Sequence, residues 1–165
     1  MTAIVSSAGT PRPVRRVVAL VGNLRTPSRT HRVADSVARV LSAGDHDVVD
    51  LAALGSQVLE PGDPEVADAL NTVTRADVLV VATPTYKGTY TGLLKAFLDR
   101  LGPDALAGVD AVPVMLAAAP DHKLAVDVHL TPLLLELGAS VPNRGLFVLE
   151  ADVERADELA RAWAA

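Results

Sequence analysis

The chain has 165 residues, half of them hydrophobic, and a formal net charge of −5 at pH 7. The length fits one domain, the acidic balance argues against a general nucleic-acid binder, and the apolar content argues against disorder. It contains no cysteine, which excludes disulfides, thiolate nucleophiles and cysteine-bound metals and fits a cytoplasmic protein. One Trp, two Tyr and two Phe are too few for a stacking surface that binds single-stranded nucleic acid.

The start of the chain differs from the remainder. Residues 1–13 are mostly small and polar, and we expect a flexible N-terminal leader ahead of one domain over residues 14–165. The leader lacks the apolar run of a secretory signal, and no apolar run approaches the roughly 20 residues of a membrane helix. The domain then alternates apolar runs with segments of helical periodicity. The predicted strands are 14–21, 46–51, 77–82, 111–118 and 140–149. The predicted helices are 28–42, 64–75, 91–101, 121–137 and 152–163.

This alternation predicts an α/β fold. Strands that are apolar throughout are typical of a parallel sheet covered by helices on both faces, so we expect a three-layer sandwich. Right-handed crossovers leave few topologies, and the flavodoxin-like strand order 2-1-3-4-5 is the one we expect at this size. Ligands bind beyond the carboxyl ends of the strands in such sheets. The candidate site therefore lies in the loops after the first, third and fourth strands.

The loop after the first strand, residues 22–30, favours a phosphate. It lacks the glycine spacing of dinucleotide-binding and P-loop motifs. It instead combines hydroxyl groups and arginines with a helix start, where free N–H groups attract anions. The alternative is that Ser28 is only an N-cap and the arginines are solvated. Six of the twelve arginines lie in the first 32 residues, which favours the phosphate, although Arg12, Arg15 and Arg16 precede the strand at the opposite end.

The loop after the third strand begins at Pro84 and holds both tyrosines, Tyr86 and Tyr90. A tyrosine at this edge offers a flat face to a planar ring, and Gly88 permits a close backbone approach. The alternative is a long strand–helix connection whose aromatic residues are incidental. The scarcity of aromatic residues favours the first interpretation.

Residues 17–30 and 80–101 together resemble the NADPH-dependent FMN reductase family of the flavodoxin-like superfamily. The segment ATPTYKGTYTGLLKAFLDRL is similar to that family's P-x-Y-K-(G/A)-(S/T)-(Y/F)-(S/T)-G-x-L-K-x-x-L-D motif almost position for position. The branch that the chain resembles most supplies reduced flavin to two-component monooxygenases, such as alkanesulfonate monooxygenase. The resemblance covers most of residues 15–149.

The resemblance implies an NAD(P)H:FMN oxidoreductase that uses FMN and either NADPH or NADH. It also implies a homodimer or homotetramer and a flavin-dependent monooxygenase as partner. No side chain is assigned a catalytic role, because hydride transfer is chemistry of the cofactors, and no metal site is expected. The residues implied for the FMN phosphate are Ser28, Arg29 and Thr30, with Arg25 close by. The residues implied for the flavin ring are Pro84, Thr85, Tyr86, Lys87 and Gly88.

The third loop departs from the family. Relatives carry Gly-Gly-Ser before a histidine, whereas this chain has Ala118-Ala119-Pro120-Asp121 before His122. We still place Asp121 and His122 beside the cofactor. The lost glycines and the missing N–H of proline reduce the backbone options, which favours loosely held flavin. Two alternatives stay open: a reductase of quinones, azo compounds or metal oxyanions with bound flavin, and a flavodoxin-like electron carrier or flavin-free subunit.

Two smaller expectations follow from single residues. Pro132 lies inside the predicted helix 121–137 and should kink it, because it cannot donate a hydrogen bond to Val128. The four histidines show no metal-ligand spacing. We expect His31 and His46 to face the solvent.

Overall fold

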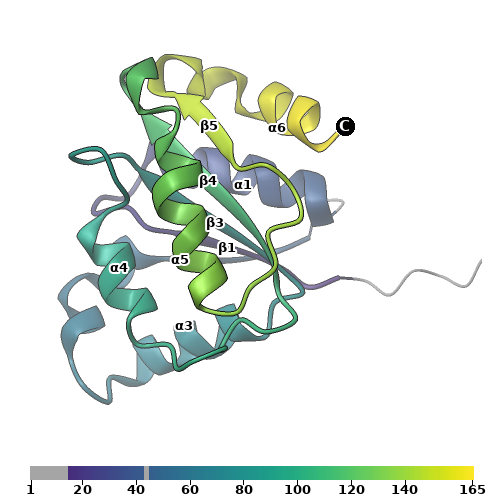
Figure 1. The fold of residues 1–165 in the computed structure, drawn as a ribbon. Coiled ribbons are helices and arrows are strands. Elements are labelled where there is room, and N and C mark those ends of the chain that lie inside the picture. The colour runs from purple at the N-terminus through teal and green to yellow at the C-terminus, as the bar shows by residue number, and fades with distance from the viewer. Residues whose placement is uncertain (1–14, 43–44) are drawn as a thin grey trace, which may run out of the picture.

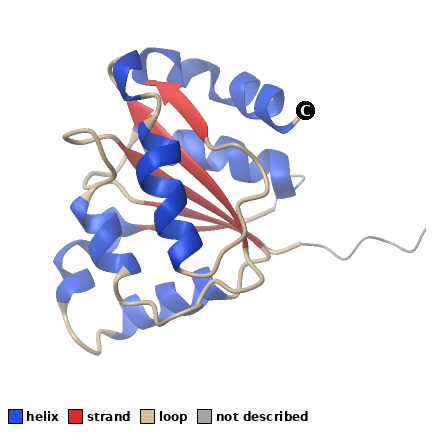
Figure 2. Cartoon of the chain, in the orientation of Figure 1, coloured by secondary structure: helices blue, strands red, loops and turns tan. Residues whose placement is uncertain are grey.

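A computed structural model describes residues 15–42 and 45–165. The predicted leader, residues 1–13, lies outside the described residues. Five parallel strands form one sheet in the order β2-β1-β3-β4-β5, with helices on both faces (Figures 1 and 2). This confirms the predicted flavodoxin-like three-layer sandwich and its strand order. The strands are β1 (Val17–Val21), β2 (Asp47–Asp50), β3 (Val78–Pro84), β4 (Asp110–Ala117) and β5 (Leu146–Leu149).

Alternating side chains of the strands divide the core into two apolar clusters. In β1, Val18 and Leu20 pack into one cluster, and Val17, Ala19 and Val21 pack into the other. This is the period of two that a strand buried on both faces requires. The first cluster lies under α3 (Pro64–Thr74), α4 (Gly92–Leu98) and α5 (Thr131–Glu136). The second lies under α1 (Arg29–Ser42) and α6 (Ala156–Ala164).

Short helical turns complete the chain. They are α2 (Leu51–Leu54), η1 (Gly55–Leu59), η2 (Pro120–His122), the π-helical η3 (Val126–Leu130) and η4 (Glu150–Arg155). The start of α3 follows the sequence prediction, with Pro64 in the first turn, where its missing N–H costs nothing. No helix in the described part of the chain is long and apolar enough to cross a membrane.

The helix predicted over 121–137 is interrupted. Pro132 cannot donate to Val128, and the backbone widens just before it into the π turn η3. Thr131 repairs this turn, because both its N–H and its Oγ1 donate to the carbonyl oxygen of Val126, the latter at 3.0 Å. The predicted helix is therefore divided into a widened turn and α5. Proline and π turns are both common causes of such irregular helices.

The expectation for His46 is wrong. Its side chain is only 7% exposed, because its Nε2 lies 3.0 Å from Asp35 Oδ1 on α1. His31 is more open, at 40% exposure, and contacts Asp50 Oδ2 at 3.2 Å.

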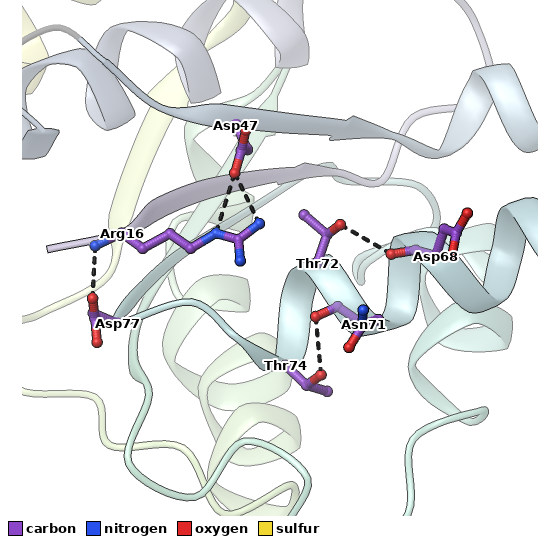
Figure 3. A network of polar contacts seen from close by, with 7 residues as sticks. All are labelled: Arg16, Asp47, Asp68, Asn71, Thr72, Thr74 and Asp77. Atoms are coloured by element: carbon purple, nitrogen blue, oxygen red, sulfur yellow. Dashed lines mark hydrogen bonds and ion pairs between the residues drawn. The ribbon is translucent and has the colours of Figure 1, made fainter.

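Arg16 joins neighbouring strands at their amino ends. Its backbone N–H donates to Asp77 Oδ2 at 2.6 Å, and its guanidinium donates twice to Asp47 Oδ2, at 3.2 and 3.1 Å (Figure 3). Arg15 donates to Asp110 Oδ2 at 2.5 Å. These arginines lie at the end of the sheet opposite to the candidate site, as predicted.

Candidate functional site

A cavity of about 320 Å³ opens at the carboxyl ends of the strands. Ligand pockets usually measure about 300 to 1,000 Å³, so this cavity lies at the lower end of that range. Its lining joins the first loop to the ends of β3, β4 and β5. The lining residues are Asn23, Arg25, Pro27, Ser28, Arg29, Thr30, Pro84, Tyr86, Leu116 and Glu150.

Buried threonines hold the first loop and the third-strand loop together beneath this cavity. Thr91 Oγ1 donates to the carbonyl oxygen of Gly22 at 2.7 Å, and Thr91 N–H donates to Thr83 Oγ1 at 3.2 Å. Thr91 Oγ1 also caps α4 by accepting from the N–H of Leu94 at 3.2 Å. A Cβ on Gly22 would come within 2.7 Å of Leu94 Cβ, so only glycine permits this approach of α4.

The first turn of α1 presents hydrogen-bond donors to the cavity. Ser28 is the N-cap, because its Oγ accepts from the N–H of His31 at 3.0 Å. Thr30 Oγ1 accepts from Asn23 Nδ2 at 3.3 Å, which closes the loop onto the helix. Within the described chain, neither hydroxyl has an acceptor, and the N–H groups of Arg29 and Thr30 have no partner. Such unpaired donors at a helix start suit an anion.

The two predicted arginines of this loop differ in their partners. Arg29 Nη1 lies 2.5 Å from Glu150 Oε2, where η4 begins after β5. Arg25 is exposed and has no ion-pair partner in the described part of the chain. A ligand anion would therefore meet one unpaired arginine and one arginine that is already engaged.

A tight hairpin forms the opposite wall. Tyr86 N–H donates to the carbonyl oxygen of Thr89 at 2.9 Å, and Thr89 N–H donates back to Tyr86 at 3.3 Å. The two central residues, Lys87 and Gly88, have φ values of 54° and 84°, as a two-residue turn of type I′ requires. Tyr86 is 43% exposed at the cavity. Tyr90, by contrast, packs against the core under α4, so only one of the two tyrosines reaches the site.

Thr85 carries an unpaired hydroxyl between two residues that line the cavity. Its N–H donates to the carbonyl oxygen of Leu116 at 2.6 Å, which fixes it against β4. Its Oγ1 is buried and has no hydrogen-bond partner. Because a buried polar atom without a partner is costly, this hydroxyl indicates a place for a polar ligand atom.

Comparisons with known proteins identify the family of the chain. The sequence profile of the NADPH-dependent FMN reductase family matches residues 15–154. The chain belongs to this family. It is 37% identical over 148 residues to the NADH-dependent FMN reductase SfnE of Pseudomonas putida, covering 83% of this chain and 78% of that protein. It is 36% identical over 146 residues to the FMN reductase (NADPH) of Escherichia coli K12, covering 84% and 75%.

A solved structure gives the same result for the fold. The apo form of the NADH:FMN oxidoreductase EMOB matches with a TM-score of 0.78 and 32% identity, over 90% of this chain and 88% of that one. The predicted enzyme class, an NAD(P)H:FMN oxidoreductase, is that of the family.

The structure brings together only part of the FMN-binding set that the sequence predicts. Six of its residues line the cavity, namely Arg25, Ser28, Arg29, Thr30, Pro84 and Tyr86. Thr85 lies directly between two of these. Lys87 and Gly88 form the hairpin tip, and Asp121 and His122 are exposed on η2. These four residues lie outside the cavity lining.

Sequence reasoning did not assign four residues of the cavity lining, namely Asn23, Pro27, Leu116 and Glu150. It also missed Thr83 and Thr91, which hold the loops together. A signal existed for Thr91, since it precedes α4 and is a good N-cap type. No spacing in the sequence points to Glu150, because its pairing with Arg29 spans 121 residues.

Proposed function

We propose that this chain transfers a hydride from NADPH or NADH to FMN and releases the reduced flavin to a flavin-dependent monooxygenase in the cytoplasm. The observation that carries the proposal is the cavity at the carboxyl edge of the sheet. One wall offers unpaired anion-binding donors, and the other offers Tyr86, next to the buried and unpaired hydroxyl of Thr85. Membership in the NADPH-dependent FMN reductase family supports the same activity.

The first turn of α1 is the proposed seat of the FMN phosphate. The hydroxyls of Ser28 and Thr30 and the N–H groups of Arg29 and Thr30 are free to donate, and the guanidinium of Arg25 adds a charge-assisted donor. These groups fit a phosphate monoester. In this proposal they bind the phosphate end of FMN, and the hairpin binds the ring end.

The hairpin is the proposed seat of the flavin ring. Pro84 and Tyr86 provide apolar surface, and Thr85 Oγ1 provides a hydrogen bond to a polar atom of the ring. FMN supplies the hydride-accepting chemistry when bound, so the residues of the chain need only bind and orient. Lys87, Gly88, Asp121 and His122 stay proposed contacts to the ring or the nicotinamide, from the hairpin tip and the third loop.

We also propose a homodimer or homotetramer. Val128 on η3 and Leu135 on α5 are 56% and 53% exposed, and Leu124, in the turn just before η3, is 67% exposed. Exposed apolar patches of this kind often mark protein interfaces, and a second copy of the chain is the occupant that we propose.

Steady-state oxidation of NADPH and of NADH, each with FMN as acceptor, tests the activity. We expect turnover with FMN and little flavin retained on gel filtration, because flavin is a substrate in this proposal. A purified, folded chain that oxidises neither nicotinamide with FMN overturns the proposal. Turnover with a quinone, together with flavin that stays bound on gel filtration, would favour the quinone-reductase alternative instead.

A further inference from the structure

Glu150 places a carboxylate in the wall of the cavity that also holds the anion-binding donors. It lies where β5 ends and η4 begins, and its side chain is 35% exposed. Its Oε2 accepts a hydrogen bond from Arg29 Nη1 at 2.5 Å. A carboxylate repels a phosphate, so this residue opposes the ligand that the neighbouring groups attract.

The ion pair with Glu150 also occupies the guanidinium of Arg29, which a bound phosphate would otherwise contact. Arg29 is a donor of the proposed phosphate seat, yet its guanidinium already contacts Glu150. A phosphate must therefore compete with Glu150 for Arg29, whereas Arg25 has no such competitor among the described residues. Both effects lower the affinity for the phosphate end of the flavin and leave the ring end untouched.

Space on both sides allows the pair to open. A second cavity, of about 410 Å³, shares Arg29 and Glu150 with the first and continues toward Arg32 and Glu154. Arg29 is 65% exposed, so its side chain can turn toward a ligand without displacing the core.

We propose that Glu150 sets the affinity for FMN by competing with the flavin phosphate for Arg29, so that reduced FMN is released rather than retained. The inference deepens the proposed function and rests on it. If so, the phosphate contributes less to the binding free energy of FMN than it would if the donors of α1 acted without Glu150.

The test compares two flavins that differ only in the phosphate. Dissociation constants for FMN and riboflavin are measured by quenching of flavin fluorescence, for the wild-type chain and for E150Q. We expect E150Q to bind FMN about tenfold more tightly, because one repulsion is removed and one exposed ion pair is weakened. Riboflavin affinity should change by less than about twofold, since it carries no phosphate.

E154Q is a matched control. Glu154 lies four residues later on η4 and pairs with Arg32 at 2.6 Å, but it does not line the first cavity. The substitution changes the net charge of the protein by the same amount as E150Q. We expect E154Q to bind both flavins like the wild type, which separates local competition from long-range charge.

The outcomes distinguish this inference from the proposed function. A wild type that binds FMN, with E150Q binding it equally or more weakly, overturns the role of Glu150 and leaves the FMN reductase proposal standing. Equal tightening of FMN and riboflavin, or equal effects of E150Q and E154Q, also overturns it. A wild type that binds no flavin overturns both.

Discussion

The hydroxyl of Thr91 donates a 2.7 Å hydrogen bond to the carbonyl oxygen of Gly22, which lies 69 residues earlier in the chain. Both residues are buried. The bond joins the point where β1 enters the first loop to the point where α4 begins, so it sets the separation of the two walls of the cavity. The distance between the proposed phosphate and ring seats therefore depends on one threonine that touches neither.

Replacing Thr91 with Val should destabilise the protein by about 2–3 kcal/mol, since it removes an N-cap and the shorter of the two hydroxyl hydrogen bonds to the buried carbonyl of Gly22. Urea unfolding followed by circular dichroism measures this loss. Thr91→Ser keeps the hydroxyl and should retain most of the stability. A Val variant as stable as the wild type would show that the hydrogen bonds of this hydroxyl do not carry the effect.

Replacing Thr85 with Val should separate stability from binding. The substitution removes a buried hydroxyl that has no partner, so the flavin-free protein should be at least as stable as the wild type. FMN and riboflavin should both bind about fivefold more weakly, because one hydrogen bond to the ring is worth about 1 kcal/mol. Thermal melts and fluorescence titration give the two readouts, and Thr85→Ser is the control. A Val variant with unchanged flavin affinity contradicts the assignment of this hydroxyl.

A hydrogen bond between α1 and α6 should make the stability of the folded protein depend on pH in the acid range. Ser36 Oγ donates to Asp157 Oδ1 at 2.6 Å, and this bond, helped by Arg39, lowers the pKa of Asp157 from its ordinary value of 3.8. A carboxyl whose pKa is lowered by folding stabilises the folded state above its ordinary pKa and loses that contribution as the pH falls.

Comparing Ser36→Ala with the wild type tests this linkage. The melting temperature of the variant should be lower at neutral pH, and the gap should narrow as the pH falls below 3.8, where Asp157 takes up a proton. Melts of both proteins across an acid pH series check the expectation. A gap that stays constant from neutral to acid pH would contradict it.

Charged residues on the exposed apolar stretch should dissociate the proposed oligomer. Leu124 and Val128 are exposed in the single chain, so Leu124→Glu with Val128→Glu costs little within the subunit but buries two charges in an interface. We expect a smaller mass by sedimentation and an unchanged circular dichroism spectrum. Leu59→Glu, a substitution at a residue 70% exposed on η1, is the control. An unchanged mass of the double variant places the interface elsewhere.

The sheet could be predicted from the sequence because each strand carries its own signal. Unbroken apolar runs such as Val78–Ala82 need no partner to be recognised, and the strand order then follows from few permitted topologies. The helix over 121–137 was only partly predictable. Pro132 indicates an irregularity, but the widened turn depends on Thr131 reaching Val126, which is a matter of geometry.

The candidate site was predictable where a loop carries its chemistry locally. Ser28 and the hairpin around Gly88 follow from the preferences of helix caps and turns. Glu150 was missed because its contact with Arg29 is made by folding. Two expectations were wrong for the same reason. Tyr90, expected to face a planar ring, packs against the core, and His46, expected to face the solvent, packs beside Asp35 of α1, and neither contact is visible in the local sequence pattern.

The cavity lining begins at Asn23 and ends at Glu150, and this span has a consequence for the order of assembly. Synthesis delivers the donors of α1 first, the hairpin next, and Glu150 last, directly after β5. A nascent chain therefore cannot complete the lining of the cavity until the last of the five strands has been made. Flavin captured during translation would mark a subunit that has already paired all five strands.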